Sequence, residues 1–171
     1  MRLFDLSRAP QQAAPPRQDR IALTHAQRRR HRQMLTLPDG ECVGLITPRD
    51  HVLQDGERWY CAQGDALQIE AACEPLLRAS SNDPHTLCRA AWHLGNRHTA
   101  VEIQPVCLQI QPDPVLHDLL LALGLRVEAV NAVFEPESGA YAGGHRHGHD
   151  ETFAEDHALA RGLFQQHHGD A

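Results

Sequence analysis

The most constraining feature of the sequence is a helix whose beginning and end are both marked. Asp113 supplies an N-cap side chain, Pro114 suits the first helical position, and Gly124 provides a stop. Between these signals the leucines recur at helical spacing and form one apolar stripe: Leu116, Leu119, Leu120 and Leu123. The sequence therefore predicts a helix here that buries one of its faces.

A second helix is predicted before it, from Pro84 to a stop at Gly95, where glycine permits a left-handed cap. Strand-like runs surround the two helices, at residues 76–79, 101–103, 106–110 and 125–133. The resulting order is β-α-β-β-α-β. Residues 75–138 are therefore predicted to form a ferredoxin-like α+β domain.

The preceding region is punctuated by turns instead of helix caps. Pro38-Asp39-Gly40 and Asp55-Gly56 separate short strand-like runs at residues 34–37, 42–46, 52–54 and 58–61. Residues 19–74 are therefore predicted to form a small all-β domain of hairpins. Residues 1–18 are rich in proline, alanine and glutamine, and they are expected to be a flexible leader.

Charge and hydropathy exclude several functional classes. The net charge of −6 argues against nucleic-acid binding, which needs a surplus of basic residues. The basic cluster at residues 28–32 is local: it is either a solvated turn or a patch for an acidic partner. No segment approaches the roughly 18 apolar residues of a membrane span, and the first 18 residues lack a signal-peptide run. With five scattered cysteines, these features predict a cytoplasmic protein that binds no membrane.

Histidines are concentrated at the C-terminal end of the chain. Six of the 13 histidines lie in residues 145–171, and His145, His147 and His149 form the densest group. Neutral imidazoles two residues apart can converge on one Ni²⁺, Zn²⁺ or Cu²⁺ ion. Residues 139–171 are therefore interpreted as a glycine linker and a flexible metal-binding tail. The competing interpretation is a solvated tail, or a purification tag, whose histidines bind nothing.

Catalysis is not indicated, because the HExxH, GxSxG, phosphate-loop and paired-cysteine motifs are all absent. Three other motifs are informative: HLGNRH at residues 93–98, DPVL at residues 113–116, and FEPE at residues 134–137 followed by GAYAGGH at residues 139–145. In order and spacing they resemble UreE, the nickel metallochaperone family of the urease accessory system. The resemblance covers residues 20–149.

The resemblance implies a homodimer that carries Ni²⁺ to the urease apoprotein complex with the help of the accessory GTPase UreG. It also implies a metal-binding histidine in the DHVL motif, shared across the two-fold axis. Pro114 stands at that position here. His117, one helical turn further on, is the candidate replacement, and the tail ligands become the primary candidates.

Two other histidines, His93 and His98, are interpreted as structural residues near a helix end, where polar groups usually form hydrogen bonds with the backbone. Because Pro114 replaces the expected ligand, the chain is alternatively an adaptor for urease maturation that binds metal weakly, or that binds zinc or copper instead of nickel. The choice of nickel comes from the resemblance, since imidazole sites do not by themselves select it.

Overall fold

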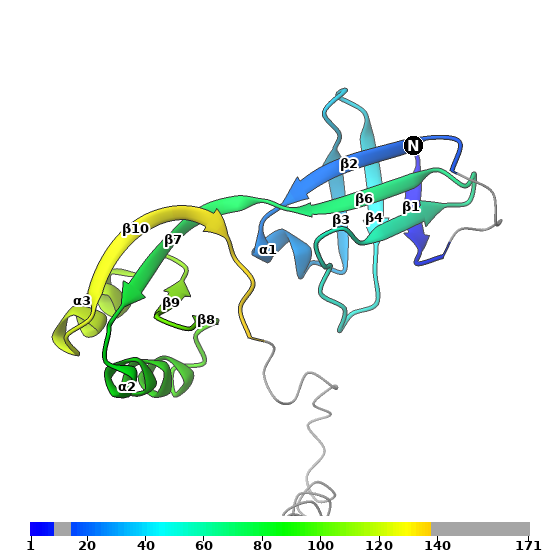
Figure 1. The fold of residues 1–171 in the computed structure, drawn as a ribbon. Coiled ribbons are helices and arrows are strands. Elements are labelled where there is room, and N and C mark those ends of the chain that lie inside the picture. Colours follow the sequence, from blue (N-terminus) through cyan, green and yellow to red (C-terminus); the bar gives the residue numbers. More distant parts are fainter. Residues whose placement is uncertain (9–14, 138–171) are drawn as a thin grey trace, which may run out of the picture. The chain divides into compact units, whose positions relative to one another are not determined.

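The computed structural model describes residues 1–8 and 15–137. The predicted tail lies outside the described residues, and so do its candidate ligands His145, His147 and His149. Within the described part strands predominate, and they form separate sheets of six and four strands (Figure 1). None of the helices in this part is long and apolar enough to cross a membrane.

The first sheet contains six strands: β1 (Leu3–Leu6), β2 (Gln18–Leu23), β3 (Arg32–Thr36), β4 (Cys42–Ile46), β5 (Arg58–Cys61) and β6 (Ala66–Ala71). Their order is β2-β6-β5-β1-β4-β3. The β1–β4 and β2–β6 pairs are parallel, and the other pairs are antiparallel. The apolar core of this sheet consists of Phe4, Leu23, Leu35, Leu37, Val43, Leu45, Leu53, Trp59, Cys61, Leu67 and Ile69.

The expectation of a flexible leader is wrong for the first strand. β1 lies inside the sheet between β5 and β4, and the side chain of Phe4 is 0% exposed. The physical reason is long-range pairing: Leu3 and Phe4 align with Gly44 and Leu45, about forty residues away, and local composition does not report such a contact. Residues 9–14 lie outside the described part of the chain.

A short helix, α1 (His25–Arg28), connects β2 to β3. Its first turn is closed by a capping box, in which the Thr24 hydroxyl accepts from the Gln27 nitrogen and the Gln27 side chain accepts from the Thr24 nitrogen. The strand predicted at residues 52–54 is absent. Instead, the nitrogen of the buried Leu53 donates to the Arg28 carbonyl oxygen at 3.1 Å, so Leu53 is bonded to the end of α1.

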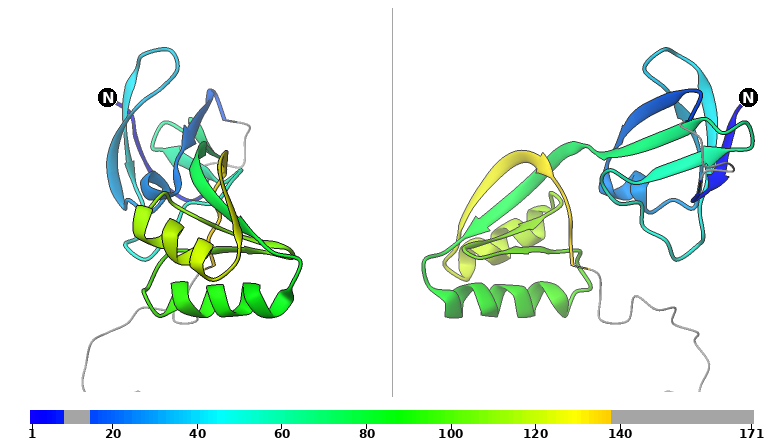
Figure 2. Two further views of the ribbon diagram at one scale, coloured as in Figure 1. Left: turned by 90° about the vertical axis from the view of Figure 1, so that its left-hand side faces the viewer. Right: turned by 45° about the vertical axis from the view of Figure 1, so that its right-hand side comes forward.

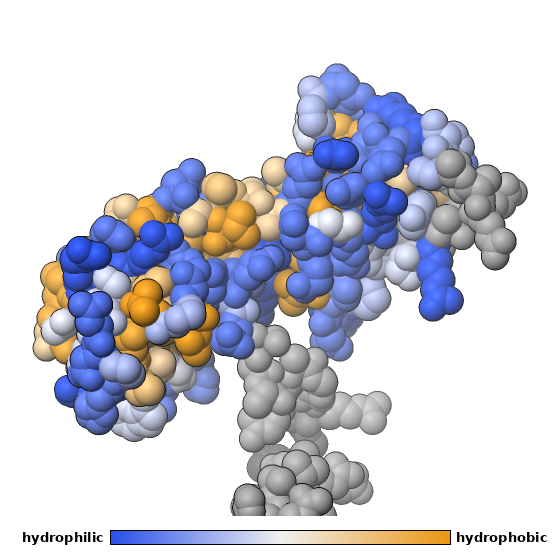
Figure 3. All heavy atoms as spheres, in the orientation of Figure 1, coloured by the Kyte–Doolittle hydropathy of each residue, from blue (hydrophilic) through white to orange (hydrophobic). Residues whose placement is uncertain are grey.

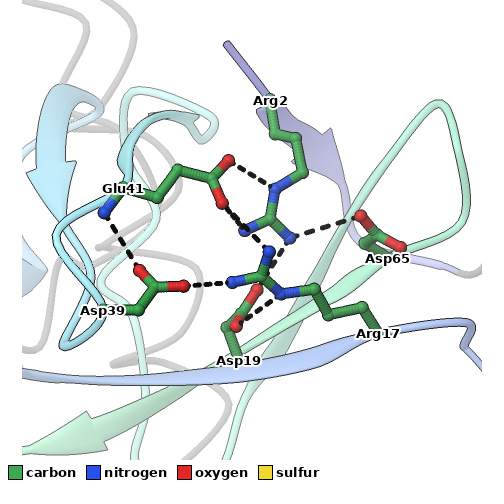
Figure 4. A network of polar contacts seen from close by, with 6 residues as sticks. All are labelled: Arg2, Arg17, Asp19, Asp39, Glu41 and Asp65. Atoms are coloured by element: carbon green, nitrogen blue, oxygen red, sulfur yellow. Dashed lines mark hydrogen bonds and ion pairs between the residues drawn. The ribbon is translucent and has the colours of Figure 1, made fainter.

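An ion-pair network joins Arg2, the residue before β1, to carboxylates of β2 and of two loops (Figure 4). Arg2 forms a bidentate pair with Glu41, at 2.8 Å from Nε and 2.7 Å from Nη2, and its Nη1 also contacts Asp19 and Asp65. Arg17 contacts Asp19, Asp39 and Glu41. The Arg2 guanidinium has its pKa raised, chiefly by the hydrogen bond with Glu41. The network therefore holds the N-terminal strand in place by charge as well as by burial.

The second sheet contains four strands: β7 (Cys73–Ser80), β8 (Glu102–Gln104), β9 (Cys107–Ile110) and β10 (Arg126–Val133). Their order is β10-β7-β9-β8, and all three neighbouring pairs are antiparallel. Two helices, α2 (Pro84–Gly95) and α3 (Pro114–Ala122), follow β7 and β9. The elements from β7 to β10 thus follow one another in the order that the sequence predicts.

Both helices begin as predicted and pack by their apolar stripes. Asp83 caps α2 by accepting from two backbone nitrogens, and Asp113 caps α3 by accepting from the Leu116 nitrogen at 2.9 Å. Figure 2 shows the two helices beneath the arch of β7 and β10. Helices and sheet share one apolar core: Ala79, Ala90, Leu94, Leu108, Ile110, Leu116, Leu120 and Leu125.

Candidate metal-binding region

The end of α2 places His98 in an unusual backbone conformation. Its φ is 53°, and it is the one residue other than glycine with positive φ among residues 1–8 and 15–137. The His98 nitrogen donates to the Gly95 carbonyl oxygen at 2.9 Å, and the Thr99 nitrogen donates to the Leu94 carbonyl oxygen at 3.3 Å. These two bonds define a Schellman turn, in which the left-handed position is usually glycine.

The end of α3 provides a direct comparison within the same chain. There the Gly124 nitrogen donates to Leu121 at 2.9 Å and the Leu125 nitrogen to Leu120 at 3.1 Å, with φ of 91° at Gly124. The turn is the same, but glycine occupies the left-handed position. A side chain at that position costs roughly 1 kcal/mol, so His98 is kept at some expense to stability. Such local strain is often found at functional residues.

The sequence analysis assigned both the turn and the histidine differently. Gly95 was expected to be the left-handed cap, but it is the last residue of α2 and does not have positive φ. The helix instead continues into the turn at residues 96–98. The His98 side chain is exposed and has no hydrogen-bond partner among the described residues. His93 packs its ring edge-on against Trp92, with centroids 4.9 Å apart.

The last described segment, residues 134–137, lies close to this turn. We call it the tail root, because the predicted metal-binding tail follows it. The Glu137 nitrogen donates to the Val101 carbonyl oxygen at 2.9 Å, and the Glu135 nitrogen donates to Glu102 Oε2 at 2.9 Å. The other oxygen of Glu102 accepts from Gln104 and Gln109. The tail root is therefore fixed three residues from His98.

The candidate ligand His117 lies in the first turns of α3 and is partly exposed. Its Nδ1 is 3.1 Å from Asp118 Oδ1. A carboxylate on one ring nitrogen fixes the imidazole tautomer and leaves Nε2 available as a ligand. Pro114 occupies the first position of α3 and offers no side-chain ligand. Among residues 1–8 and 15–137, no three His, Cys, Asp or Glu side chains are grouped closely enough to hold a metal ion.

Comparison with known proteins agrees with the division into two parts. The family description "UreE urease accessory protein, N-terminal domain" matches residues 5–72, and "UreE urease accessory protein, C-terminal domain" matches residues 74–169. Together they account for most of the chain.

Individual relatives give the same result. The chain is 50% identical to the urease accessory protein UreE of Burkholderia thailandensis over 149 residues, which is 87% of this chain and 70% of the relative. It is 50% identical to the protein of the same name from Burkholderia ambifaria and 49% identical to that from Burkholderia mallei, again over 87% of this chain and over 74% and 73% of those relatives. The chain belongs to the UreE family of urease accessory proteins.

Proposed function

We propose that this chain is a nickel metallochaperone that delivers Ni²⁺ for assembly of the urease active site. Membership in a urease accessory family supports a role in urease maturation and not in catalysis. The urease apoprotein complex and the accessory GTPase UreG are the proposed partners, and the cytoplasm is the proposed location. The proposed domains are residues 19–74, an all-β domain, and residues 75–138, a ferredoxin-like domain, for which the strand order β10-β7-β9-β8 is support.

The observation that carries the proposal is the hydrogen bond from Glu137 to Val101. Two residues lie between His98 and Val101, so the Cα atoms of these two residues are at most about 11 Å apart. The exposed His98 is therefore close to Glu137, the last described residue before the predicted tail.

The proposed ligands come from two regions of the chain, the C-terminal tail and the second domain. His145, His147 and His149 supply imidazoles from the tail, and His98 or His117 supplies one from the folded domain. Imidazole nitrogen suits Ni²⁺. A carrier must also be able to release the ion, and the titration described below measures how tightly the ion is held.

A homodimer would bring a second copy of each fixed ligand. Large apolar side chains stand exposed on the second domain: Trp92, Ile103, Val106, Val115 and Leu121. Figure 3 shows apolar groups at the surface of this part of the chain. Exposed apolar surface of this kind is typical of protein interfaces, and a second copy of the chain is the proposed occupant.

Isothermal titration of the full chain with Ni²⁺ tests the proposal. Binding at micromolar concentration is expected, and it should weaken when His145, His147 and His149 are changed together to alanine. Absence of nickel binding by the unaltered chain would exclude the carrier role. If the same triple variant lost nickel but still captured the urease apoprotein complex and UreG, the adaptor function would be favoured.

A further inference from the structure

Exposed basic side chains gather at one end of the first domain. Residues 29–32, which run from the end of α1 to the first residue of β3, have the sequence Arg-Arg-His-Arg, and all four are exposed. The loop at residues 47–53 lies beside this segment, because the Thr47 nitrogen donates to the His31 carbonyl oxygen at 2.8 Å. The same loop carries the exposed Arg49. We call this set the basic end: Arg29, Arg30, His31, Arg32 and Arg49.

The four arginines of the basic end have no carboxylate partner among residues 1–8 and 15–137. Elsewhere in the same domain arginines are paired, since Arg2 and Arg17 contact four carboxylates between them. Asp50 is the single acidic residue within residues 29–32 and 47–53. The positive charge of the basic end is therefore largely uncompensated in the described part of the chain.

Arg28, the next residue along the chain, adds a buried guanidinium to this region. It is 2% exposed, and it donates to the carbonyl oxygens of Leu53 and Phe134, which satisfy its hydrogen bonds without neutralising its charge. His25 on the same helix shows the effect of the local field. Burial lowers the pKa of His25, and the charges of Arg28 and Arg29 lower it further, against the opposite effect of Glu74.

Protection of a sheet edge does not account for the basic end. β3 is the last strand in the sheet order β2-β6-β5-β1-β4-β3, and a charge on an edge strand discourages pairing with other molecules. However, Arg32 is the one member of the basic end that belongs to β3. Like charges held close together repel and lower the stability of the folded state. The fold therefore gains nothing from the other three arginines, and a binding role explains them better.

We propose that the basic end binds an acidic polypeptide segment of a partner protein. Met34 follows two residues after Arg32 on β3, so the two side chains lie on the same face of the sheet, and Met34 is 59% exposed. Methionine beside arginine is a combination enriched at protein interfaces. A nucleic acid fits less well, because the chain has a net charge of −6. This inference goes beyond the proposed nickel function and does not depend on it.

The test compares two double variants of the full chain that change its net charge equally. Arg30→Gln with Arg32→Gln removes two charges from the basic end, whereas Arg89→Gln with Arg126→Gln removes two exposed charges from the second domain. The probe is a short fluorescein-labelled peptide of alternating glutamate and leucine, followed by fluorescence anisotropy at low salt. Its affinity should fall about fivefold in the first variant and less than about twofold in the second. Equal losses, or no binding by the unaltered chain, would overturn the inference.

A second probe distinguishes a polypeptide from a nucleic acid. Single-stranded DNA with as many negative charges as the peptide should bind more weakly than the peptide does. Met34→Gln should weaken binding of the peptide and leave binding of the DNA unchanged, because the thioether side chain meets the leucines. Tighter binding of the DNA would overturn the inference and assign the basic end to a nucleic acid.

Two further measurements separate partner binding from support of the fold and from self-association. The free energy of unfolding in urea should stay the same or rise in Arg30→Gln with Arg32→Gln, because repulsion between like charges is relieved. A clear fall would show that these arginines serve the fold. Light scattering should show unchanged self-association, and its loss would assign the basic end to contacts between copies of the chain. Either of these results would overturn the inference, whereas absence of nickel binding would exclude only the proposed function.

Discussion

His98 occupies at the end of α2 the left-handed backbone position that Gly124 occupies at the end of α3. The hydrogen bonds of the two turns correspond one to one. The turn at Gly124 is therefore an internal reference for how much His98 lowers the free energy of unfolding. A stability cost at one turn and not at its counterpart points to a requirement for that imidazole.

Replacing His98 by glycine should separate stability from metal binding. His98→Gly removes the left-handed strain, so the free energy of unfolding should stay the same or rise by up to about 1 kcal/mol. Nickel affinity should fall by about tenfold if the imidazole is a ligand. Urea denaturation and nickel titration measure the two quantities. Unchanged nickel affinity would remove His98 from the proposed site.

The reciprocal change provides the control. Gly124→His places a side chain at φ of 91° with no atom within 4 Å of the new Cβ, so the cost should be conformational and not steric. The free energy of unfolding should fall by about 1 kcal/mol, without effect on nickel affinity. A much larger loss in the urea transition would show that the two turns are not equivalent.

Asp118 provides a test of His117. If His117 binds metal through Nε2, the carboxylate 3.1 Å from Nδ1 orients the ring, and Asp118→Asn should weaken nickel binding. Because Asp118 is highly exposed, the effect should be about tenfold or less. His117→Ala is the companion variant in the same titration. If neither change moves the affinity, His117 is a surface residue of α3.

The Arg2 network should make the first domain sensitive to acid. The pKa of Glu41 is lowered, chiefly by its hydrogen bond with Arg2, and that of Asp39 is lowered, chiefly by the bond from the Glu41 nitrogen. Carboxyls with depressed pKa values contribute stability above their ordinary values near about 4, and this contribution is lost as the pH falls through the depressed values.

Urea denaturation between about pH 6 and pH 3 measures this effect, and Glu41→Gln is the variant of choice. It should be less stable than the unaltered chain at neutral pH and should lose less stability on acidification. Parallel pH profiles for the two proteins would contradict the assignment.

Exposed apolar residues test the proposed dimer. Val115 is 74% exposed on α3, and Met34 is 59% exposed on β3. Val115→Glu should weaken self-association by about tenfold or more, because it places a charge in the proposed interface, whereas Met34→Glu should leave it unchanged. Light scattering across a concentration series measures the difference. Equal behaviour of the two variants would place the interface elsewhere.

The second domain was largely predictable because its signals are local. Asp83 with Pro84, and Asp113 with Pro114, mark helix starts that depend on neighbouring residues alone, and both helices begin where predicted. The first domain was less predictable. β1 depends on partners about forty residues away, and α1 is one turn long, too short for an apolar period.

The candidate site was only partly predictable, for a different reason. The end of α2 was predicted at Gly95, because glycine commonly ends a helix. The left-handed residue is instead His98, three positions later, where no glycine is present. The missed clue was that HLGNRH continues for three residues beyond its glycine before the next apolar run. The hold on the tail root joins residues more than one hundred positions apart, Arg28 and Phe134, and no pattern in the sequence reports it.

The central place of β1 has a practical consequence for handling the gene. A misplaced start codon or a truncated expression plasmid can remove the first eight residues. Because β1 is a central strand and not an edge strand, its loss would separate β4 from β5 and divide the sheet. Two unpaired strand edges would then face solvent, and such edges readily join those of other molecules. Precipitation during expression is the expected sign of a missing N-terminus, even when every histidine is still present.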